Sequence, residues 1–326
     1  MQTNEITDAA NWDQLVTAHG GHPLQLWGWG EVKTAHGWSA TRITVSSEAG
    51  ELLGGAQILE RRIPFIGRTI AYVPRGPWCE IAQRATVLTE LATYLRNHSC
   101  AISVLIEPDW QTTEGLEGWK GTDQNVLLAS TLQLDLTQST EVLLDDIAAK
   151  RRYDIRTSTK KLTEIRPIKS DKELQAILAI YHDTATRAGF SLHSDEYYRA
   201  IHRNLGEHSV ITAAFIGTQP VAFTWYAVTP QVAFELYGGI IEAGQKQRAN
   251  FGLKWYGIEH FRTQGVAVYD FNGLLNDGIS NFKRNFASHE TQLVGSYIMP
   301  LSPWHAIWNT IQPLAKHVAR IVARVR

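Results

Sequence analysis

Cysteine and long apolar runs are scarce in this sequence. Cys79 and Cys100 are the only cysteines among 326 residues, too few for a disulfide framework or a cysteine-rich zinc site, which fits a reducing compartment. No apolar run is long enough to span a bilayer, and residues 1–5 lack the basic and apolar regions of a secretory signal. From these absences we expect a cytoplasmic protein.

An excess of either charge is also lacking. The sequence has 31 Lys and Arg residues against 32 Asp and Glu residues, a formal net charge of -1. A surface that attracts nucleic acid or membranes all over is therefore excluded, although local basic patches stay open. With 44% hydrophobic and 19% charged residues and no low-complexity linker, the composition is that of a globular protein with room for two domains.

The order of the predicted elements occurs twice, as helix, three strands, helix and strand. In the first half these elements fall at 25–36, 40–45, 52–59, 70–73, 84–97 and 101–106. In the second half they fall at 195–204, 210–215, 221–228, 234–237, 250–263 and 266–271. This internal duplication predicts two homologous α/β domains. The boundary is expected near 139–146, where polar residues cap a new helix.

The segment 277–286, with the sequence DGISNFKRNF, combines a helix start with a cation between two aromatic residues. Phe282 and Phe286 lie one helical turn apart, so both are expected to face the core. Lys283 lies about 100° around the helix from Phe282, at the edge of the buried face, where its ammonium could reach a cleft. A group that meets developing negative charge needs such a position; the alternative is an ordinary surface lysine.

A basic stripe is predicted on the helix that follows the boundary. Arg152, Arg156 and Lys160 are spaced four residues apart, so they share one helix face. Such a stripe can follow the phosphates of a nucleic acid such as tRNA. A solvated helix face is the alternative, because charge runs are common on protein surfaces.

The element order within each half resembles the acyltransferase fold of the GNAT superfamily. In that fold a glycine-rich helix N-terminus, Gln/Arg-x-x-Gly-x-Gly, holds the pyrophosphate of coenzyme A. Here the matching segment 247–252 reads QRANFG, with Asn250 in place of the first glycine, and segment 79–84 contains no glycine. Neither half is therefore expected to bind coenzyme A.

Seven short motifs follow one another along the chain: LWGWGEVK at 26–33, YVPRGP at 72–77, KRRYDIR at 150–156, TRAGF at 186–190, YGG at 237–239, YDFNG at 269–273 and FK at 282–283. Together they resemble the FemXAB aminoacyltransferases, which add amino acids from aminoacyl-tRNA to the stem peptide of peptidoglycan precursors. The resemblance implies two GNAT-like domains, at 1–145 and 146–298, with 299–326 returning to the first. The short segments between Thr186 and Lys283 leave no room for the helical arm of some relatives.

The resemblance also implies the chemistry. An aminoacyl ester is already activated, so an amine can attack it without ATP, metal or another cofactor, with aminoacyl-tRNA as the co-substrate. Lys283, next to Phe282, is implied to stabilise the tetrahedral oxyanion. The sequence supplies no obvious general base. Glu107 and Asp109 are candidates for orienting or deprotonating the amine, while proton transfer assisted by the substrate is the preferred hypothesis.

Further residues are implied to bind the precursor. Lys33 corresponds to a lysine implicated in binding the diphosphate. A family arginine–tyrosine pair maps to His193 and Tyr197, and a neutral histidine would bind diphosphate less tightly than arginine. Arg187 is a candidate to compensate for this. The other candidates for substrate contact are Tyr237, Arg75 and Trp29, with Trp27 and Trp38 as possible neighbours in a groove.

The segment 303–326 has apolar residues at alternating spacings of three and four, which predicts an amphipathic helix with a basic polar side. It is expected to pack on the first domain, or to rest on the inner face of the cytoplasmic membrane. Three functions stay open: a tRNA-dependent aminoacyltransferase, a coenzyme A dependent N-acyltransferase, and a non-catalytic precursor- or tRNA-binding protein. The expected partners are aminoacyl-tRNA and either UDP-MurNAc-pentapeptide or lipid II, with the chain a monomer.

Overall fold

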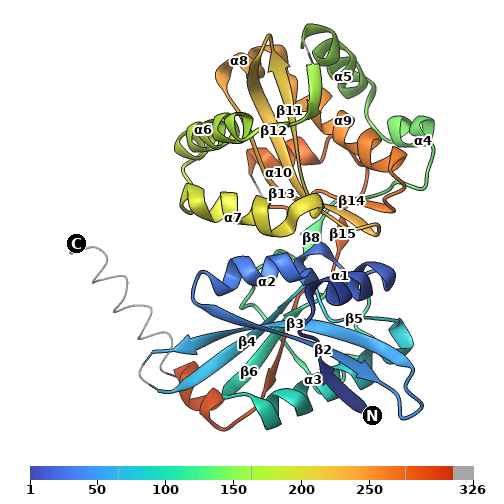
Figure 1. Ribbon diagram of the computed structural model, residues 1–326. Coiled ribbons are helices and arrows are strands. Elements are labelled where there is room, and N and C mark those ends of the chain that lie inside the picture. The colour runs from blue at the N-terminus through green and yellow to red at the C-terminus, as the bar shows by residue number, and fades with distance from the viewer. Residues whose placement is uncertain (65, 163, 276, 311–326) are drawn as a thin grey trace. The chain divides into compact units, whose positions relative to one another are not determined.

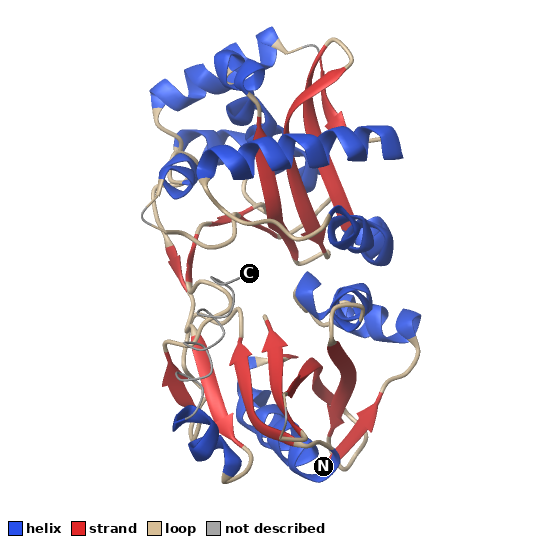
Figure 2. Cartoon of the chain, turned by 90° about the vertical axis from the view of Figure 1, so that its left-hand side faces the viewer, coloured by secondary structure: helices blue, strands red, loops and turns tan. Residues whose placement is uncertain are grey.

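The computed structural model describes residues 1–310 except 65, 163 and 276 (Figure 1). The chain divides into two compact units. Unit 1 contains Met1–Trp12, Lys33–Val126 and the chain from Val294 onward. Unit 2 contains Asp13–Val32 and Leu127–Leu293. Each unit is an α/β structure in which helices pack on one large sheet (Figure 2).

Unit 1 is built on an eight-stranded sheet in the order β1-β2-β3-β4-β6-β16-β7, with β5 paired to β3. Only β4 and β6 pair in parallel among these described strands. The apolar face of helix α3 is buried against the sheet. The elements are β1 (Gln2–Glu5), β2 (Trp38–Ser46), β3 (Leu52–Ile63), β4 (Arg68–Pro74), β5 (Trp78–Cys79), η2 (Ile81–Gln83), α3 (Arg84–His98), β6 (Ala101–Glu107), β7 (Lys120–Thr122) and β16 (Ser296–Pro300).

Unit 2 is built on a six-stranded sheet in the order β10-β11-β12-β13-β14-β9, with a separate two-stranded sheet of β15 and β8. Its strands are β8 (Ser130–Thr131), β9 (Gln133–Asp135), β10 (Glu164–Pro167), β11 (Ser209–Ile216), β12 (Gln219–Val228), β13 (Val232–Ile240), β14 (Val268–Asp270) and β15 (Thr291–Gln292). Its helices are η1 (Pro23–Gln25), α4 (Thr140–Asp145), α5 (Ala149–Lys161), α6 (Asp171–Ala188), α7 (Asp195–Leu205), η3 (Gly206–His208), α8 (Glu242–Gln247), α9 (Ala249–Thr263) and α10 (Gly278–Lys283). Helices α1 (Ala9–Ala18) and α2 (Trp27–Thr34) cross the division between the units.

Helices cover both faces of the unit 2 sheet. The register irregularity in β13 between Glu235 and Tyr237 turns these two residues to opposite faces. Tyr237 contacts Tyr181 of α6 and Tyr198 of α7. Glu235, on the other face, pairs with Lys254 of α9. Burial on both faces makes β12 and β13 apolar over most of their length.

The parallel pair β13–β14 opens part-way along its length. The register runs from Val232 with Val268 to Phe234 with Asp270, where β14 ends, whereas β13 continues to Ile240. An irregularity in the β12–β13 register lies directly after this point, between Glu235 and Tyr237. The two chain segments therefore part, and this opening positions the site described below.

The predicted α/β fold of two GNAT-like domains is confirmed, since the order helix, three strands, helix, strand is present in each half of the chain. The expected boundaries differ from the observed division. Strand β9 pairs with β14, so segment 127–145 belongs to unit 2, as does Asp13–Val32. Strand β16 pairs with β6, which places the chain from Val294 in unit 1. Most of the predicted amphipathic helix at 303–326 lies outside the described residues.

Candidate active site

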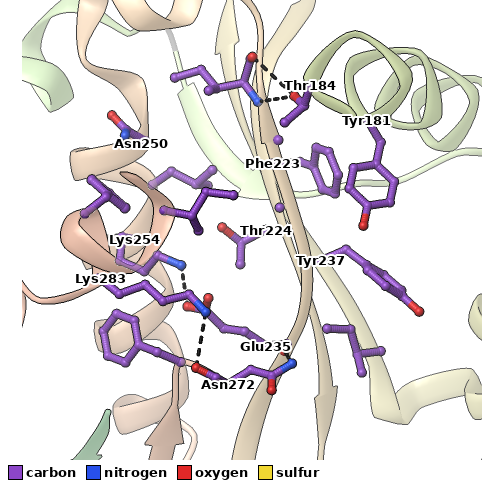
Figure 3. A pocket seen from close by; sticks show the side chains of 18 of the residues that line it. Tyr181, Thr184, Phe223, Thr224, Glu235, Tyr237, Asn250, Lys254, Asn272 and Lys283 are labelled. Atoms are coloured by element: carbon purple, nitrogen blue, oxygen red, sulfur yellow. Dashed lines mark hydrogen bonds and ion pairs between the residues drawn. The ribbon is translucent and has the colours of Figure 1, made fainter. Parts of the chain in front are cut away.

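A cavity of about 370 Å³ lies in unit 2, at the opening between β13 and the chain that follows β14 (Figure 3). Its lining comes from α6, β12, β13, α9, α10 and the loop after β14. One end of the cavity carries charged and polar groups, and the other carries aromatic rings. Every lining residue belongs to unit 2, so this unit alone forms the cavity.

Lys283 presents its ammonium to the charged end. Asp277 caps α10 by accepting a hydrogen bond from the backbone N–H of Ser280 at 2.7 Å. Lys283 Nζ donates to the carbonyl oxygens of Asn272 at 3.2 Å and Gly273 at 3.0 Å. An ammonium has three N–H donors, and among the described residues the third has no partner. This third donor is available to an oxygen of a ligand.

The electrostatic surroundings of Lys283 act in opposite directions. Burial lowers the pKa of Lys283, and the nearby ammonium of Lys254 lowers it further, whereas Glu235, Asp270 and Asp277 raise it. Three carboxylates therefore favour the charged form of a partly desolvated lysine. A cation held in this way interacts strongly with negative charge that develops beside it.

A second lysine lies beneath the cavity. Lys254 of α9 forms an ion pair with Glu235 of β13, and each residue is only 6% exposed. The hydroxyl of Tyr269 donates to the same oxygen, Oε1 of Glu235. Burial lowers the pKa of Lys254, while Glu235 opposes that shift. The pair is thus a buried, hydrogen-bonded charge network that also faces the cavity.

The loop after β14 contacts both Lys283 and the strand that carries Glu235. Asn272 has a left-handed backbone, with φ of 60°, which asparagine tolerates better than most residues. Its backbone N–H donates to Asp270 at 2.7 Å, and its side-chain amide donates to the backbone carbonyl of Glu235 at 3.0 Å. These bonds tie the loop to both strands and leave the carbonyl of Asn272 facing Lys283, as Figure 3 shows.

Aromatic side chains form the other end of the cavity. The ring of Tyr181 lies 5.7 Å from that of Phe223 and 5.5 Å from that of Tyr237. Gly239 allows these groups to approach the strand closely. A Cβ there would lie 2.7 Å from the Phe223 ring and 2.9 Å from the hydroxyl of Thr184. Any larger residue at this position would force the aromatic wall to shift.

Three residues predicted from the sequence line this cavity: Lys283, Phe282 and Tyr237. The ring of Phe282 lies 5.3 Å from that of Phe286, which is fully buried, so both rings face the core as expected. Helix α10 nevertheless ends at Lys283, and Phe286 lies beyond it. Burial raises the pKa of Tyr237 well above its usual value, so its phenol stays protonated.

The other unit 2 candidates lie outside the cavity lining. Arg187, at the end of α6, donates to the backbone carbonyl of Ile240 and pairs with Asp183 at 3.6 Å. His193 is exposed, and its ring lies 4.1 Å from that of Tyr197, which is buried. The predicted histidine–tyrosine pair is therefore in contact, while its role in binding stays a prediction.

The first-half candidates have different surroundings. Lys33 is half-buried in the last turn of α2, and burial lowers its pKa to about 8. Arg75 is buried with a left-handed φ of 48°, and Trp29 is buried in α2. Asp109 is half-buried. Contact of any of these residues with a substrate stays a prediction.

Glu107 is the candidate whose surroundings differ most from expectation. It is 1% exposed and accepts hydrogen bonds from the hydroxyl of Tyr72 at 2.6 Å, the backbone N–H of Val126 at 2.6 Å and the hydroxyl of Ser296 at 2.7 Å. Three donors that converge on one buried carboxylate form a structural network. The expectation that Glu107 meets the attacking amine is not supported by this geometry.

The basic stripe on α5 is divided. Arg152 donates to the backbone carbonyl of Leu144 and pairs with Asp145 at 3.5 Å, so it secures the link to α4. Arg156 and Lys160 are exposed and line a hollow between α5, β10 and α9. These two residues can meet a phosphate backbone, whereas Arg152 is already engaged.

The N-terminus of α9, where the GNAT fold would hold the pyrophosphate of coenzyme A, is covered by α5. The backbone N–H of Gly252 donates to the hydroxyl of Ser158, and Arg248 pairs with Asp154. A Cβ on Gly252 would lie 2.8 Å from the Ser158 hydroxyl. The residues at this position therefore do not fit a pyrophosphate, in agreement with the departure at Asn250.

Within residues 1–310, with the three gaps given above, no helix is long and apolar enough to cross a membrane. Over the same residues, no cluster of three or more His, Cys, Asp or Glu side chains is arranged to hold a metal ion.

Two family models match successive parts of the chain. Residues 7–118 match the FemAB family, and residues 149–284 match the acetyltransferase (GNAT) domain family. The two matches cover successive parts of the chain and include the Phe282–Lys283 motif. Together these matches support membership of the FemXAB family. The matches agree with the GNAT-like fold described above.

Individual relatives of the chain support the same family. A lipid II:glycine glycyltransferase of Staphylococcus saprophyticus is 27% identical over 221 residues, which cover 62% of this chain and 52% of the relative. Its counterpart in Staphylococcus haemolyticus is 26% identical over 226 residues, covering 64% and 53%. The chain thus spans about half the length of these curated relatives.

Solved structures show the same fold. The crystal structure of FemX matches with a TM-score of 0.85 at 18% identity, over 95% of this chain and all of that one. A tandem GNAT protein from the clavulanic acid biosynthesis pathway matches with a TM-score of 0.50 at 13% identity, over 93% of this chain and 99% of that one. At these identities the likeness establishes the fold alone.

Two members of the site were missed by the sequence analysis, Glu235 and Lys254. Each is a charged residue inside an otherwise apolar element, in the segments FELY and GLKWY. Buried charges are rarely found without a partner, so their presence in β13 and α9 was the available signal. What the sequence could not show is that these two elements bring them together.

Proposed function

We propose that this protein transfers an amino acid from aminoacyl-tRNA to a stem-peptide amine of a peptidoglycan precursor, UDP-MurNAc-pentapeptide or lipid II, in interpeptide bridge formation. The relatives named as lipid II:glycine glycyltransferases support an acyltransferase of this class. One structural observation carries the proposal. The ammonium of Lys283 is fixed by two backbone carbonyls at a cavity and keeps one N–H donor for a ligand.

The reaction needs a stabilised oxyanion more than it needs an activated group on the protein. The amine nitrogen attacks the ester carbonyl carbon, and the carbonyl π electrons move onto oxygen, where Lys283 donates its free N–H. The carbon–oxygen ester bond then breaks as the amide forms. The leaving ribose oxygen takes the proton that the amine loses, so the substrates themselves can complete the proton transfer. The proposed reaction needs no cofactor.

Binding roles follow from charge and exposure. We assign Lys33 to the precursor diphosphate. Phosphate binding needs a positive charge held in place, and a half-buried lysine supplies one. Arg156 and Lys160 are exposed and are assigned to tRNA phosphates. We further propose that the protein acts as a monomer in the cytoplasm. When lipid II is the acceptor, it makes peripheral contact with the membrane.

The proposal is tested by product formation from defined substrates. Total tRNA is charged with one radiolabelled amino acid at a time and incubated with the protein and either UDP-MurNAc-pentapeptide or lipid II. Mass spectrometry of the product should show one added amino acid on the stem peptide. No product with any amino acid on either acceptor, from a protein that melts cooperatively, would contradict the proposal.

A thermal-shift measurement with acetyl-coenzyme A distinguishes the proposed aminoacyl transfer from the coenzyme A dependent alternative. Because α5 covers the N-terminus of α9, acetyl-coenzyme A is expected to leave the melting temperature unchanged. A concentration-dependent rise would instead support an acyl-coenzyme A enzyme.

A further inference from the structure

The carboxylate of Glu235 has one oxygen committed to the protein and one that is not. Oε1 takes both the ammonium of Lys254 and the hydroxyl of Tyr269. Among the described residues, Oε2 accepts no hydrogen bond, although the side chain lines the cavity. A carboxylate oxygen that lines a cavity and has no protein partner can accept a hydrogen bond from a ligand in that cavity.

The free groups of Glu235 and Lys283 belong to the same end of the cavity (Figure 3). The two side chains do not pair with each other, since Lys283 donates to two backbone carbonyls and Glu235 pairs with Lys254. They nevertheless interact, because Glu235 is the leading charge that raises the pKa of Lys283. The cavity thus offers one N–H donor and one carboxylate acceptor side by side.

An α-aminoacyl group carries complementary features on adjacent atoms. Its carbonyl oxygen becomes the oxyanion that Lys283 meets, and its α-amino group is bonded to the neighbouring carbon. A free α-amino group has a pKa of about 7.7–8.0, so it is largely an ammonium at neutral pH. Such an ammonium is a strong donor to a carboxylate.

We propose that Glu235 binds the α-ammonium of the transferred aminoacyl group through Oε2, and so makes the cavity select acyl groups that carry a free α-amino group. Lys254 and Tyr269 are positioning residues, because they hold Oε1 and fix the direction of Oε2. This inference rests on the proposed aminoacyl transfer and adds a donor-recognition residue to it.

Charge balance favours the same assignment. The ammonium groups of Lys254 and Lys283 interact with the carboxylates of Glu235, Asp270 and Asp277. A donor that develops an oxyanion while it carries an α-ammonium adds one charge of each sign, so it leaves the net charge of the site unchanged. An α-hydroxyacyl donor of the same shape adds the negative charge only and leaves Oε2 without an ionic partner.

The test uses two stable analogues of the donor end, 3'-deoxy-3'-(glycylamino)adenosine and its glycolylamino counterpart, which differ only in an amino or a hydroxyl group. Their affinities are measured by titration calorimetry for wild type, the double variant E235Q/K254M and the control Lys246→Met. The double variant removes both buried charges together, so neither is left unpaired. Lys246 lies in an exposed pair with Glu242 and should leave binding unchanged.

Wild type is expected to bind the glycyl analogue about 10- to 100-fold more tightly than the glycolyl analogue, the range of a charge-assisted hydrogen bond. The double variant should bind the two within about threefold of each other. Equal binding by wild type, together with aminoacyl transfer activity, would overturn the role of Glu235 and leave the proposed function standing. Absence of both transfer and analogue binding would overturn both proposals.

Discussion

Replacing one partner of the buried Lys254–Glu235 pair should destabilise unit 2 far more than replacing both. Each residue is 6% exposed, so either single change leaves one buried charge without its counter-ion. Breaking a buried ion pair from one side costs about 3–5 kcal/mol. We therefore expect Glu235→Gln and Lys254→Met each to cost this much of the free energy of unfolding.

The double variant is expected to lose much less free energy of unfolding. Glutamine and methionine are close in volume to the residues they replace, and neutral replacements of buried ion pairs are often close to neutral in stability, so E235Q/K254M should cost about 2 kcal/mol or less. If the two sites were independent, their costs would add to about 6–10 kcal/mol. The expected coupling energy is thus at least about 4 kcal/mol.

Urea unfolding followed by tryptophan fluorescence measures these differences. With a slope of about 2–3 kcal/mol per molar urea, each single variant should move the midpoint down by about 1–2.5 M. Lys246→Met, which removes a lysine from an exposed pair with Glu242, is the matched control and should leave the midpoint unchanged. Single-variant losses that add up in the double variant would refute the coupled network.

Three further predictions address other parts of the chain. Because the pKa of Lys33 is lowered to about 8, its charge is present below that pH and lost above it, so kcat/KM for UDP-MurNAc-pentapeptide should fall as pH rises through about 8. Lys33→Arg stays charged and should shift this fall to higher pH; an unshifted profile would exclude Lys33. Gly239→Ala should lower kcat/KM at least about tenfold, because its Cβ would lie 2.7 Å from the Phe223 ring, whereas the equivalent atom in Gly238→Ala meets only a contact at 3.4 Å. Equal kinetics for the two glycine variants would contradict this account of the aromatic wall. Glu107→Gln should cost about 1–3 kcal/mol of stability by disturbing three hydrogen bonds, yet leave kcat within about threefold, as thermal melts and assays at low temperature would show. A loss of kcat by two orders of magnitude would return Glu107 to the catalytic candidates.

The folded-state pKa of Lys33 also has a consequence for stability. An unfolded lysine titrates near 10.4, so between about pH 8 and that value the unfolded state binds more protons than the folded state. The free energy of unfolding contributed by this group therefore rises with pH over that window.

The fold could be predicted from the sequence because the same order of helices and strands occurs in both halves of the chain. Short apolar runs rich in β-branched and aromatic residues at 210–215 and 221–228 predict strands that the structure has as β11 and β12. The domain boundary was less accessible. Nothing local indicates that Gln133–Asp135 pairs with β14, since that pairing joins residues more than a hundred positions apart.

The site was predictable only where one short motif contains it. Lys283 could be identified because Phe282 and Asp277 fix its place on a short helix. The hydrogen bonds of Glu107 could not be predicted, because two of its donors, Val126 and Ser296, come from other segments of the chain. Lys254 and Glu235 form one unit only after folding, so their separate positions in α9 and β13 concealed it.

The central claim is that the Lys283 ammonium stabilises the oxyanion of aminoacyl transfer. The most direct test is the single-turnover rate constant of transfer from aminoacyl-tRNA, measured for wild type and Lys283→Met at saturating substrates, with donor affinity measured in parallel. The account predicts a rate loss of about 100- to 1,000-fold with donor affinity within about threefold. A folded Lys283→Met protein whose rate stays within about fivefold of wild type would contradict the account.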